Sequence, residues 1–177
     1  MPILREEVYT IKDILNLPKG ERAELIDGQM YMMVASSSDH QELIADLITD
    51  INNYIRGHGG GCKVYGAPFA VFLSEDTEYV EPDISVICDP SKIDKRGCHG
   101  APDWVIEIVS PSSRSRDCLI KLVTYREEGV REYWIVDPDR DRVTIYNLRD
   151  DIVTDYSMKD SVPVGIYNDE LKIRMVR

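Results

Sequence analysis

The stretch Trp104-Val105-Ile106-Glu107-Ile108-Val109 has the composition of a buried β-strand, and Tyr133-Trp134-Ile135-Val136 has the same character. Between them, the segment 110 to 113 breaks the pattern, and a helix is expected from residue 115 to about residue 128, where Gly129 ends it. A helix that connects two strands favours a parallel pair within a mixed sheet. This stretch therefore predicts an α/β (α+β) fold with a central mixed β-sheet flanked by helices.

Other elements are expected on either side of this stretch. Asp27-Gly28 lies between two apolar runs and predicts an N-terminal β-hairpin. From residue 40 to 56, apolar residues recur at three- and four-residue steps, which indicates an amphipathic helix with an N-cap in the polar cluster 36 to 39. The remaining expectations are a short helix at Ile11–Leu17, strands at Cys62–Tyr65, Ala70–Leu73, Tyr79–Ile87 and Val143–Tyr146, a loop over 91 to 102, and short strands over 152 to 176.

The length and composition are those of a globular protein. A chain of 177 residues that is 43% hydrophobic can bury a core, and we expect a single domain over residues 1 to 177. No apolar run reaches membrane-spanning length, and the N-terminus lacks the apolar core of a signal peptide. The four cysteines form no CxxC pair, so we expect free thiols in a reducing cytoplasm: Cys62, Cys88, Cys98 and Cys118.

The charge balance is strongly acidic. Twenty-one basic and 32 acidic residues give a net charge of −11, and the pI is near 4.7. This balance is unusual for a protein that mainly grips phosphate backbones. It does not exclude a local basic strip on one face, formed by Arg114, Arg116, Lys121 and Arg126.

Asp83 and Glu107 are acidic residues inside apolar strands. Burying a carboxylate is costly unless it is paired or coordinates a metal, and here the pattern occurs on consecutive strands. Mg²⁺ and Mn²⁺ prefer carboxylate oxygens and keep several water ligands. We therefore expect Asp83 and Glu107 to bind such a cation, with Glu24 as a candidate third acid. Alternatively, backbone groups cap Asp83 at a strand end, and strand alternation points Glu107 to solvent.

The expected helix at 115 to 128 carries a second group of polar side chains. Asp117, Lys121 and Tyr125 are spaced by four residues and share one helix face. A lysine beside a metal can help to deprotonate or orient the attacking water, and Asp117 can orient that lysine. The alternative is an ordinary surface pair between Asp117 and Lys121. Tyr125 and Trp134 are also typical core aromatics, and His40 is also typical of a surface or packing histidine.

The chain carries a series of short motifs in a fixed order. They are Glu24-Leu25-Ile26-Asp27-Gly28, His40, Pro82-Asp83, Ala101-Pro102-Asp103-Trp104-Val105-Ile106-Glu107-Ile108-Val109-Ser110-Pro111, Asp117, Lys121, Tyr125, Gly129-Val130 and Glu132-Tyr133-Trp134-Ile135-Val136-Asp137-Pro138. Together these motifs resemble the Uma family of endonucleases, which belongs to the restriction-endonuclease-like PD-(D/E)XK superfamily. The resemblance covers nearly the whole chain.

The resemblance implies a restriction-endonuclease-like core and a divalent-metal-dependent endonuclease that hydrolyses phosphodiester bonds in DNA. Asp83 and Glu107 would be the metal ligands, and Lys121 would assist the attacking water. The auxiliary residues would be Glu24, His40, Asp117 and Tyr125. The superfamily's usual lysine lies two positions after the glutamate, where this chain has Val109. Lys121 on the following helix would take its place.

Partners and alternative functions follow from the same resemblance. A nucleic acid, DNA above all, would be the substrate, and a homodimer is implied because enzymes of this superfamily often cut two strands as dimers. The acidic balance and the displaced lysine favour an alternative, a catalytically inactive nucleic-acid or protein binding module on the same scaffold. An RNA or nucleotide phosphohydrolase is a third reading that no residue separates from the first.

Overall fold

A computed structural model describes residues 8 to 111 and 113 to 175 of the chain. Three expectations from the sequence concern residues outside these ranges: the character of the N-terminal segment 1 to 7, the contribution of Ser112 to the chain break after the Glu107 strand, and the last position of the segment 152 to 176. Within the described residues, no helix combines the length and the apolar character that crossing a bilayer requires.

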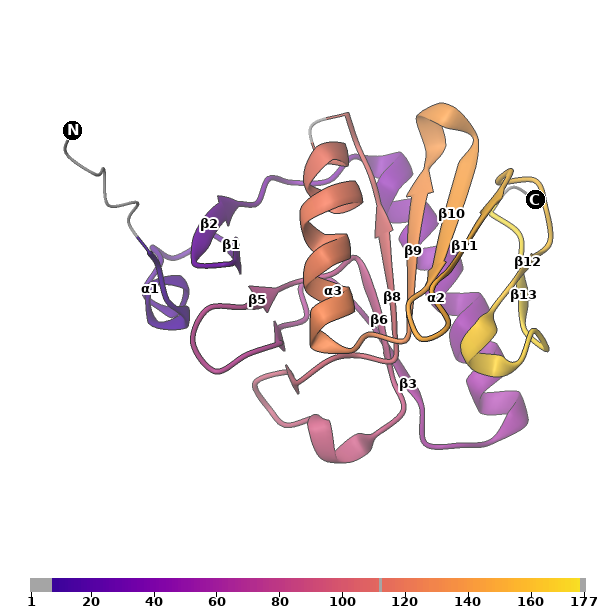
Figure 1. Cartoon of the computed structure of the whole chain (residues 1–177), viewed down its shortest axis with the longest axis horizontal. Helices are drawn as coiled ribbons and strands as arrows, with labels where there is room; N and C mark the ends of the chain where they lie inside the picture. Colours follow the sequence, from indigo (N-terminus) through magenta and orange to yellow (C-terminus); the bar gives the residue numbers. More distant parts are fainter. Residues whose placement is uncertain (1–7, 112, 176–177) are drawn as a thin grey trace.

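The main sheet is mixed, as the strand and helix pattern predicts (Figure 1). Its order is β11-β10-β9-β8-β6-β3. β8 and β9 pair in parallel across the helical connection, and the other pairs are antiparallel. The strands are β3 (Lys63–Gly66), β6 (Ile84–Ile87), β8 (Trp104–Ile108), β9 (Glu132–Asp137), β10 (Arg142–Asn147) and β11 (Ile152–Tyr156).

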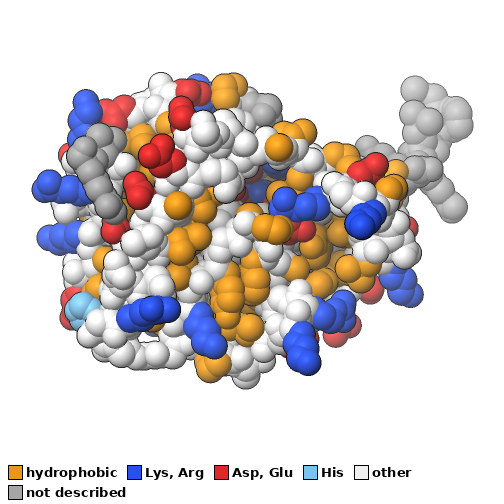
Figure 2. Space-filling view, turned by 180° about the vertical axis from the view of Figure 1, so that it is seen from behind, with side chains coloured by type: hydrophobic (Ala, Val, Ile, Leu, Met, Phe, Trp, Pro, Cys, Tyr) orange, Lys and Arg blue, Asp and Glu red, His pale blue; other side chains and the backbone are white. Residues whose placement is uncertain are grey.

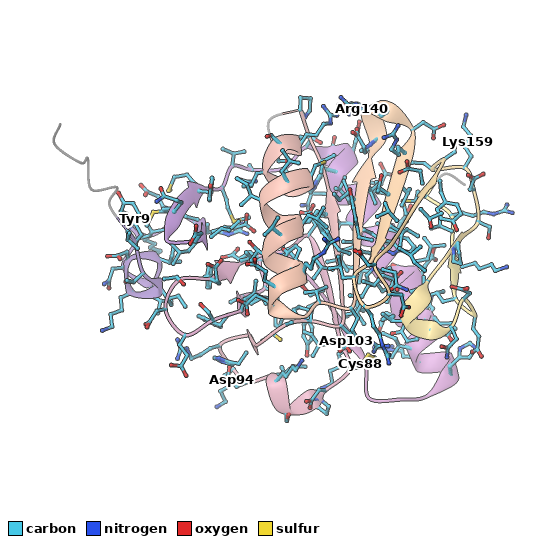
Figure 3. All side chains as sticks on the ribbon, in the orientation of Figure 1. Tyr9, Cys88, Asp94, Asp103, Arg140 and Lys159 are labelled. Carbon is cyan, nitrogen blue, oxygen red and sulfur yellow. A yellow bond between two sulfur atoms is a disulfide. The ribbon has the colours of Figure 1, made fainter. Side chains whose placement is uncertain are left out.

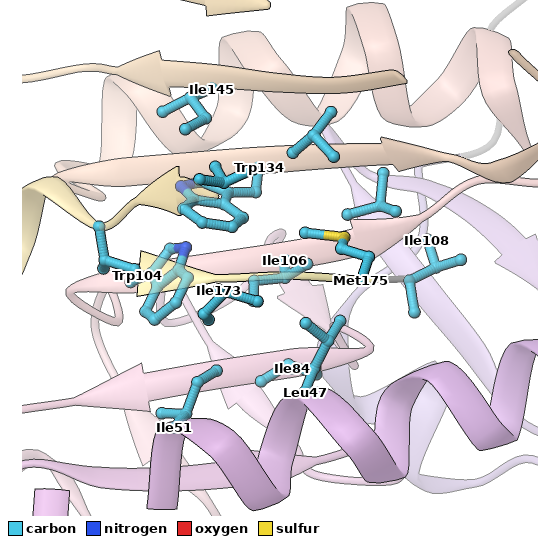
Figure 4. Close-up of a cluster of buried hydrophobic side chains, with 14 of the residues drawn as sticks. Leu47, Ile51, Ile84, Trp104, Ile106, Ile108, Trp134, Ile145, Ile173 and Met175 are labelled. Carbon is cyan, nitrogen blue, oxygen red and sulfur yellow. The ribbon is translucent and has the colours of Figure 1, made fainter. Parts of the chain in front are cut away.

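Helices cover both faces of this sheet. Figure 1 shows one helix in front of the strands and the other behind them. The helix behind is α2 (Ser38–His58), which buries Ile44, Leu47 and Ile51 against the strands. Figure 4 shows this apolar layer, in which Leu47 and Ile51 lie close to Ile84. The helix in front is a π-helical segment, η2 (Arg116–Lys121), followed by α3 (Leu122–Glu128).

A second, smaller sheet contains the expected N-terminal hairpin. Its order is β2-β1-β5-β4-β7. Ile26, Val71 and Val80 of this sheet share one hydrophobic cluster with Val105 and Tyr125 of the main sheet and α3. The strands are β1 (Ala23–Ile26), β2 (Gln29–Met32), β4 (Val71–Phe72), β5 (Tyr79–Val80) and β7 (Cys98–His99), and α1 (Ile11–Leu15) packs beside them.

The other described elements are short. A two-stranded sheet near the C-terminus pairs β12 with β13. The loop expected over 91 to 102 instead contains β7 and part of a 3-10 turn. The elements not yet given are η1 (Pro90–Lys92), η3 (Pro138–Arg140), β12 (Val162–Pro163), η4 (Gly165–Tyr167) and β13 (Lys172–Ile173).

The run expected as one strand at Tyr79–Ile87 is divided between the two sheets. β5 ends at Val80, and β6 begins at Ile84 in the main sheet. Pro82 has no N–H group to donate to a strand ladder, so it suits the crossing between sheets. The crossing leaves Asp83 directly before β6, which positions it for the site described below.

The expectation of free thiols is wrong for one pair of cysteines. Cys62 and Cys88 form a disulfide, whereas Cys98 and Cys118 are free. In the antiparallel pair of β3 and β6, Lys63 faces Ile87, so the residues just beyond them also face each other. Figure 3 shows Cys88 close to Asp103 at the end of the main sheet away from Arg140. The spacing of the cysteines in the sequence gave no signal for the Cys62–Cys88 disulfide, because the disulfide depends on the register of β3 against β6.

Candidate active site

Two acidic side chains meet where β6 begins and β8 ends. Ile84 of β6 pairs with Ile106 of β8, which brings Asp83 beside Glu107. The backbone N–H of Ile108 donates to Asp83 Oδ2 at 2.8 Å. The backbone N–H of Asp83 donates to Glu107 Oε2 at 3.4 Å. Register and these two contacts therefore place both carboxylates at one point in the fold.

Glu107 lies on a buried face of the main sheet. Ile106 and Ile108 point toward the α2 layer, whereas Val105 and Val109 belong to the cluster under α3. Glu107 alternates with the first pair and is only 4% exposed. The alternative that strand alternation points this side chain to solvent is therefore wrong, because the face opposite α2 is also covered.

Lys121 lies in the middle of an acidic cluster. Its Nζ is 2.8 Å from Glu107 Oε1, 2.9 Å from Glu24 Oε1 and 3.5 Å from Asp117 Oδ1. The lysine is 2% exposed. The Tyr125 hydroxyl donates to the same Glu107 Oε1 at 3.0 Å. Lys121 is therefore no surface partner of Asp117 alone, and the helix face predicted from the four-residue spacing does turn toward the strand acids.

The helix that carries these side chains is irregular at the site. Arg116–Lys121 is π-helical, and the Tyr133 hydroxyl donates to the backbone carbonyl of Asp117 at 3.0 Å. Asp117 and Lys121 are the buried residues of the segment, whereas Leu119 is exposed. Single π turns inside helices are frequent at functional sites because the wider turn redirects side chains. The sequence gave no signal for this turn.

Glu24 reaches the cluster from the smaller sheet. It lies in β1 and is fully buried, and its Oε1 also accepts the backbone N–H of Glu81 at 3.1 Å. Glu81 in turn accepts the Tyr79 hydroxyl at 2.8 Å and is paired with the Arg22 guanidinium. Sequence reasoning missed this supporting network, although Glu81 lies two residues from Asp83 in the same run. Its effect is to fix Glu24 against the acids of the main sheet.

His40 contacts Asp83 from the first turn of α2. Its Nε2 is 3.1 Å from both Asp83 Oδ2 and the backbone carbonyl of Ile108. The hydrogen bond to Asp83 raises the pKa of the imidazole, and burial opposes this shift. Ser37 caps the helix by accepting the backbone N–H of His40. His40 therefore orients the Asp83 carboxylate and is not a surface residue.

The carboxylates hold Lys121 in its charged form. Burial lowers the pKa of the ammonium, but Glu107, Glu24 and Asp117 together raise it well above its ordinary value. Burial raises the pKa of the Glu107 carboxyl, the Lys121 charge opposes that shift, and Asp83, Asp117 and Glu24 reinforce it. A protonated ammonium can donate hydrogen bonds that orient a water, and the expected role of Lys121 in the reaction stays a prediction.

The donor set fits a hard divalent cation. Acidic groups outnumber the cations around Lys121, and Glu24 Oε2 and Asp117 Oδ1 are buried without a hydrogen-bond partner. The described part of the chain contains no ready-made cluster of three or more His, Cys, Asp or Glu ligands. Mg²⁺ does not require one, since it is usually held by one or two carboxylates, waters and substrate phosphate. Asp83 and Glu107 could supply those carboxylates.

The basic strip considered from the sequence is not formed. Lys121 is buried, and Arg126 is paired with Asp151. Arg114 makes two hydrogen bonds to Asp137, at 2.8 and 2.9 Å. Of the four candidate residues, Arg116 has a different environment, beside both the acidic cluster and the N-terminal hairpin.

Three comparisons place the chain among known proteins. An uncharacterized protein of Synechocystis sp. is 27% identical over 144 residues, which are 79% of this chain and 75% of the relative. A solved structure from Anabaena variabilis, described as a "putative nuclease belonging to DUF820", has a TM-score of 0.76 at 22% identity and covers 98% of this chain and 96% of its own. That likeness confirms the expected fold. The Uma2 family model, described as "Putative restriction endonuclease", matches residues 7–165. The resemblance seen in the sequence motifs is thus confirmed, and the chain belongs to the Uma2 family.

Proposed function

We propose that this chain is a divalent-metal-dependent endonuclease that hydrolyses phosphodiester bonds in DNA and uses Mg²⁺ or Mn²⁺. The observation that carries the proposal is the convergence of three side chains from separate elements. Asp83 and Glu107 approach each other from β6 and β8, and the Lys121 ammonium contacts Glu107 from the following helix. The descriptions of the family and of the Anabaena variabilis structure support the nuclease class.

Asp83 and Glu107 would hold the cation through their carboxylate oxygens. When bound, a divalent cation polarises a phosphoryl oxygen and lowers the pKa of a water ligand. His40 and the backbone N–H of Ile108 fix one oxygen of Asp83. These contacts leave the orientation of that carboxylate set before substrate arrives, which reduces the reorganisation needed during the reaction.

Lys121 would act through its charge. Because its pKa is raised, the ammonium stays protonated and can donate hydrogen bonds to the attacking water or to a phosphate oxygen. Glu24 and Asp117 also contact the ammonium and would keep it in place beside Glu107. In this scheme both are positioning residues, and Tyr125 holds the Glu107 carboxylate through its hydroxyl.

The acidic net charge does not prevent local contact with a phosphate backbone. Figure 2 shows several Lys and Arg side chains along the lower edge of one face, and Asp and Glu side chains at its upper left with further Lys and Arg side chains beside them. A local row of basic side chains such as the one along the lower edge can present positive charge to nucleic acid although the whole molecule is negative. We include DNA as the substrate on this ground together with the family description.

A catalytically inactive binding module is the second candidate. The observation that favours it is that Lys121 already occupies one oxygen of Glu107 and one of Glu24. A scaffold whose acids are held by internal ion pairs can be stable without a metal. Titration of the protein with Mn²⁺ by calorimetry separates the two functions, because an inactive scaffold has no need to bind the ion through Asp83 and Glu107.

The deciding experiment is plasmid nicking in Mg²⁺ or Mn²⁺ with wild type, Asp83→Ala, Glu107→Ala and Lys121→Ala. Glu42→Ala removes an exposed acid of α2 and is the matched control. We expect metal-dependent nicking by wild type and the control, and losses of at least about 100-fold in the three site variants. Equal nicking by all five proteins would identify a contaminant and remove the support for the proposal. A parallel assay on single-stranded RNA tests the choice of DNA.

A homodimer is part of the proposal. Two copies of the site, one for each strand, would allow a duplex to be cut completely. Light scattering of the purified protein with and without duplex DNA measures the assembly. A protein that remains a monomer in both states and only nicks DNA would remove this part of the proposal and leave the hydrolytic site unaffected.

A further inference from the structure

Arg116 lies at the edge of the acidic cluster without being bonded into it. Its Nε is 3.7 Å from Asp117 Oδ1 and 3.9 Å from Glu24 Oε2. Both distances are too long for hydrogen bonds. The Nε atom is buried and has no hydrogen-bond partner, and the two facing oxygens also have none. One guanidinium N–H group and two carboxylate oxygens thus lie close together, and none of the three makes a hydrogen bond.

An aromatic ring supports the guanidinium of Arg116. Its Cζ lies 5.7 Å from the centroid of the Tyr31 ring, at a distance typical of a cation–π contact. Tyr31 belongs to β2 of the N-terminal hairpin, and Arg116 begins the π-helical segment. The Arg116 side chain is 25% exposed, whereas Lys121 beside it is almost fully buried. Arg116 therefore connects the buried acids with solvent.

Two other arginines of the chain, Arg114 and Arg22, have a structural role. Arg114 makes a bidentate contact with Asp137, and the Arg22 guanidinium is bonded to Glu81. Each has a carboxylate at hydrogen-bond distance that uses its planar donor fork. Arg116 has a similar exposure to Arg114 but no such partner. A structural role therefore accounts for Arg114 and Arg22 and does not account for Arg116.

We propose that Arg116 binds the phosphodiester group of the substrate at the site, with Tyr31 as the platform that holds its guanidinium. This inference rests on the proposed nuclease function and names a substrate-contacting residue for it. The planar fork of arginine matches two phosphate oxygens, and it remains charged at any physiological pH. The residue would place the scissile phosphate over the oxygens of Asp83 and Glu107 while Lys121 stays within the cluster.

The negative charge of the cluster explains why a positively charged side chain is needed at the position of Arg116. Glu24, Asp83, Glu107 and Asp117 repel an incoming phosphate, and Lys121 is shared among three of them. A phosphate that displaces Arg116 from its long contacts with Glu24 and Asp117 breaks no hydrogen bond of the Nε group. The guanidinium can therefore turn to the substrate without losing a hydrogen bond of its Nε group, which favours phosphate as its partner.

The test compares Arg116→Ala, Arg116→Lys and Tyr31→Phe with wild type, and Arg126→Ala is the control because that arginine pairs with exposed Asp151. Cleavage of a short DNA duplex is measured in Mn²⁺, and binding of the same duplex is measured in Ca²⁺ at several salt concentrations. For Arg116→Ala we expect kcat/KM and affinity to fall by about 10- to 100-fold. The slope of log affinity against log salt should fall by about one. Arg116→Lys should keep the slope and recover only part of the affinity, and Tyr31→Phe should resemble wild type.

The readouts separate failure of this inference from failure of the nuclease proposal. If wild type cleaves and Arg116→Ala matches it in kcat/KM, affinity and salt slope, the Arg116 inference is overturned and the nuclease remains. If wild type cleaves nothing but its binding depends on Arg116, the phosphate contact is supported and the nuclease proposal fails. If Arg116→Ala loses Mn²⁺ binding or melts more than about 5 °C lower, Arg116 is a structural residue and the inference is wrong.

Discussion

Glu107 and Glu132 are buried glutamates on neighbouring parallel strands, but their surroundings differ. Glu132 is 2% exposed, and among the described residues it accepts hydrogen bonds from neutral donors alone. The indole Nε1 of Trp134 lies at 2.6 Å, and the backbone N–H groups of Gly165 and Ile166 lie at 3.1 and 2.7 Å. A Cβ atom at Gly165 would lie 2.9 Å from Glu132 Oε2, so a side chain at this position would crowd the carboxylate. Glu132 therefore anchors η4 to the start of β9.

Glu107 is bound by a charged donor and lies among like charges. It accepts Lys121 Nζ at 2.8 Å and the Tyr125 hydroxyl at 3.0 Å. Asp83, Asp117 and Glu24 all act on its pKa, and each raises it. Such an arrangement does not minimise the free energy of folding, since a set of apolar residues would fill the same volume without desolvating charges.

The difference shows how to separate a structural acid from a functional one. Burial raises the pKa of both glutamates, so a raised pKa alone does not distinguish them. The two glutamates differ in whether the surrounding fold provides hydrogen-bond partners for the buried carboxylate oxygens. Glu132 has its oxygens satisfied by the fold, whereas the Glu107 cluster holds an excess of acid and leaves buried oxygens without hydrogen bonds. An excess of this kind is typical of a binding or catalytic site.

The largest effect is expected when the cluster loses its lysine. Lys121→Met leaves Glu24, Glu107 and Asp117 without their shared counter-charge, which should lower the free energy of unfolding by about 3–5 kcal/mol. Adding Glu107→Gln to this variant should restore part of the loss without restoring cleavage. Urea unfolding at pH 7.5 measures the stability of both variants, and plasmid nicking measures their cleavage. A Lys121→Met protein as stable as wild type would mean that the acids are already neutral or hydrated, and the contrast with Glu132 would fail.

Conservative amides at the two glutamates should have opposite consequences. Glu132→Gln replaces an acceptor oxygen by an amide that faces N–H donors, and we expect a loss of about 2–3 kcal/mol with unchanged cleavage by the folded protein. Glu107→Gln removes a charge from an overcrowded cluster, so its stability should stay within about 1 kcal/mol of wild type while cleavage falls by about 100- to 1000-fold. The two variants serve as controls for each other. If both variants lost stability and cleavage to the same extent, the two glutamates would have the same role, and the contrast between them would be wrong.

The fold could be predicted from the sequence wherever the pattern was local. Apolar periodicity indicated α2, Asp27-Gly28 indicated the β1–β2 hairpin, and the helix between β8 and β9 indicated their parallel pairing. The candidate acids stood out for the same reason, because Asp83 and Glu107 interrupt apolar runs. Asp83 and Glu107 could be proposed as neighbours because they lie on consecutive strands, and Lys121 because a short connection joins its helix to the Glu107 strand.

The other features depended on contacts between distant elements. The disulfide of Cys62 and Cys88 follows from the register of β3 against β6. The charged state of Lys121 depends on Glu24, which arrives from the other sheet. The contact of Arg116 with Tyr31 likewise joins the π-helical segment to the hairpin. Periodicity carries no information about which elements of two sheets will meet, so these features required the structure.

Glu78 offers a smaller test of the same contrast, since it is half-buried and its carboxylate is bonded to the turn of the N-terminal hairpin. Its Oε1 accepts the backbone N–H of Asp27 at 2.7 Å, and its Oε2 has no hydrogen-bond partner. Burial raises the pKa of this carboxyl to about 7 from an ordinary value of 4.5. Between these two values the folded state binds more protons than the unfolded state, so stability falls as the pH rises.

Glu78→Gln should remove this fall, because the amide cannot ionise and its oxygen can still accept the Asp27 N–H. We expect the variant to gain about 1 kcal/mol over wild type at pH 8 and nothing at pH 4, a modest gain because solvent screens a half-exposed group. Thermal unfolding at a series of pH values measures the difference, and cleavage should not change. A variant that lost cleavage would contradict the view that the raised pKa of Glu78 reflects only its local surroundings, which are burial and the neighbouring acids Asp27, Glu127 and Glu128.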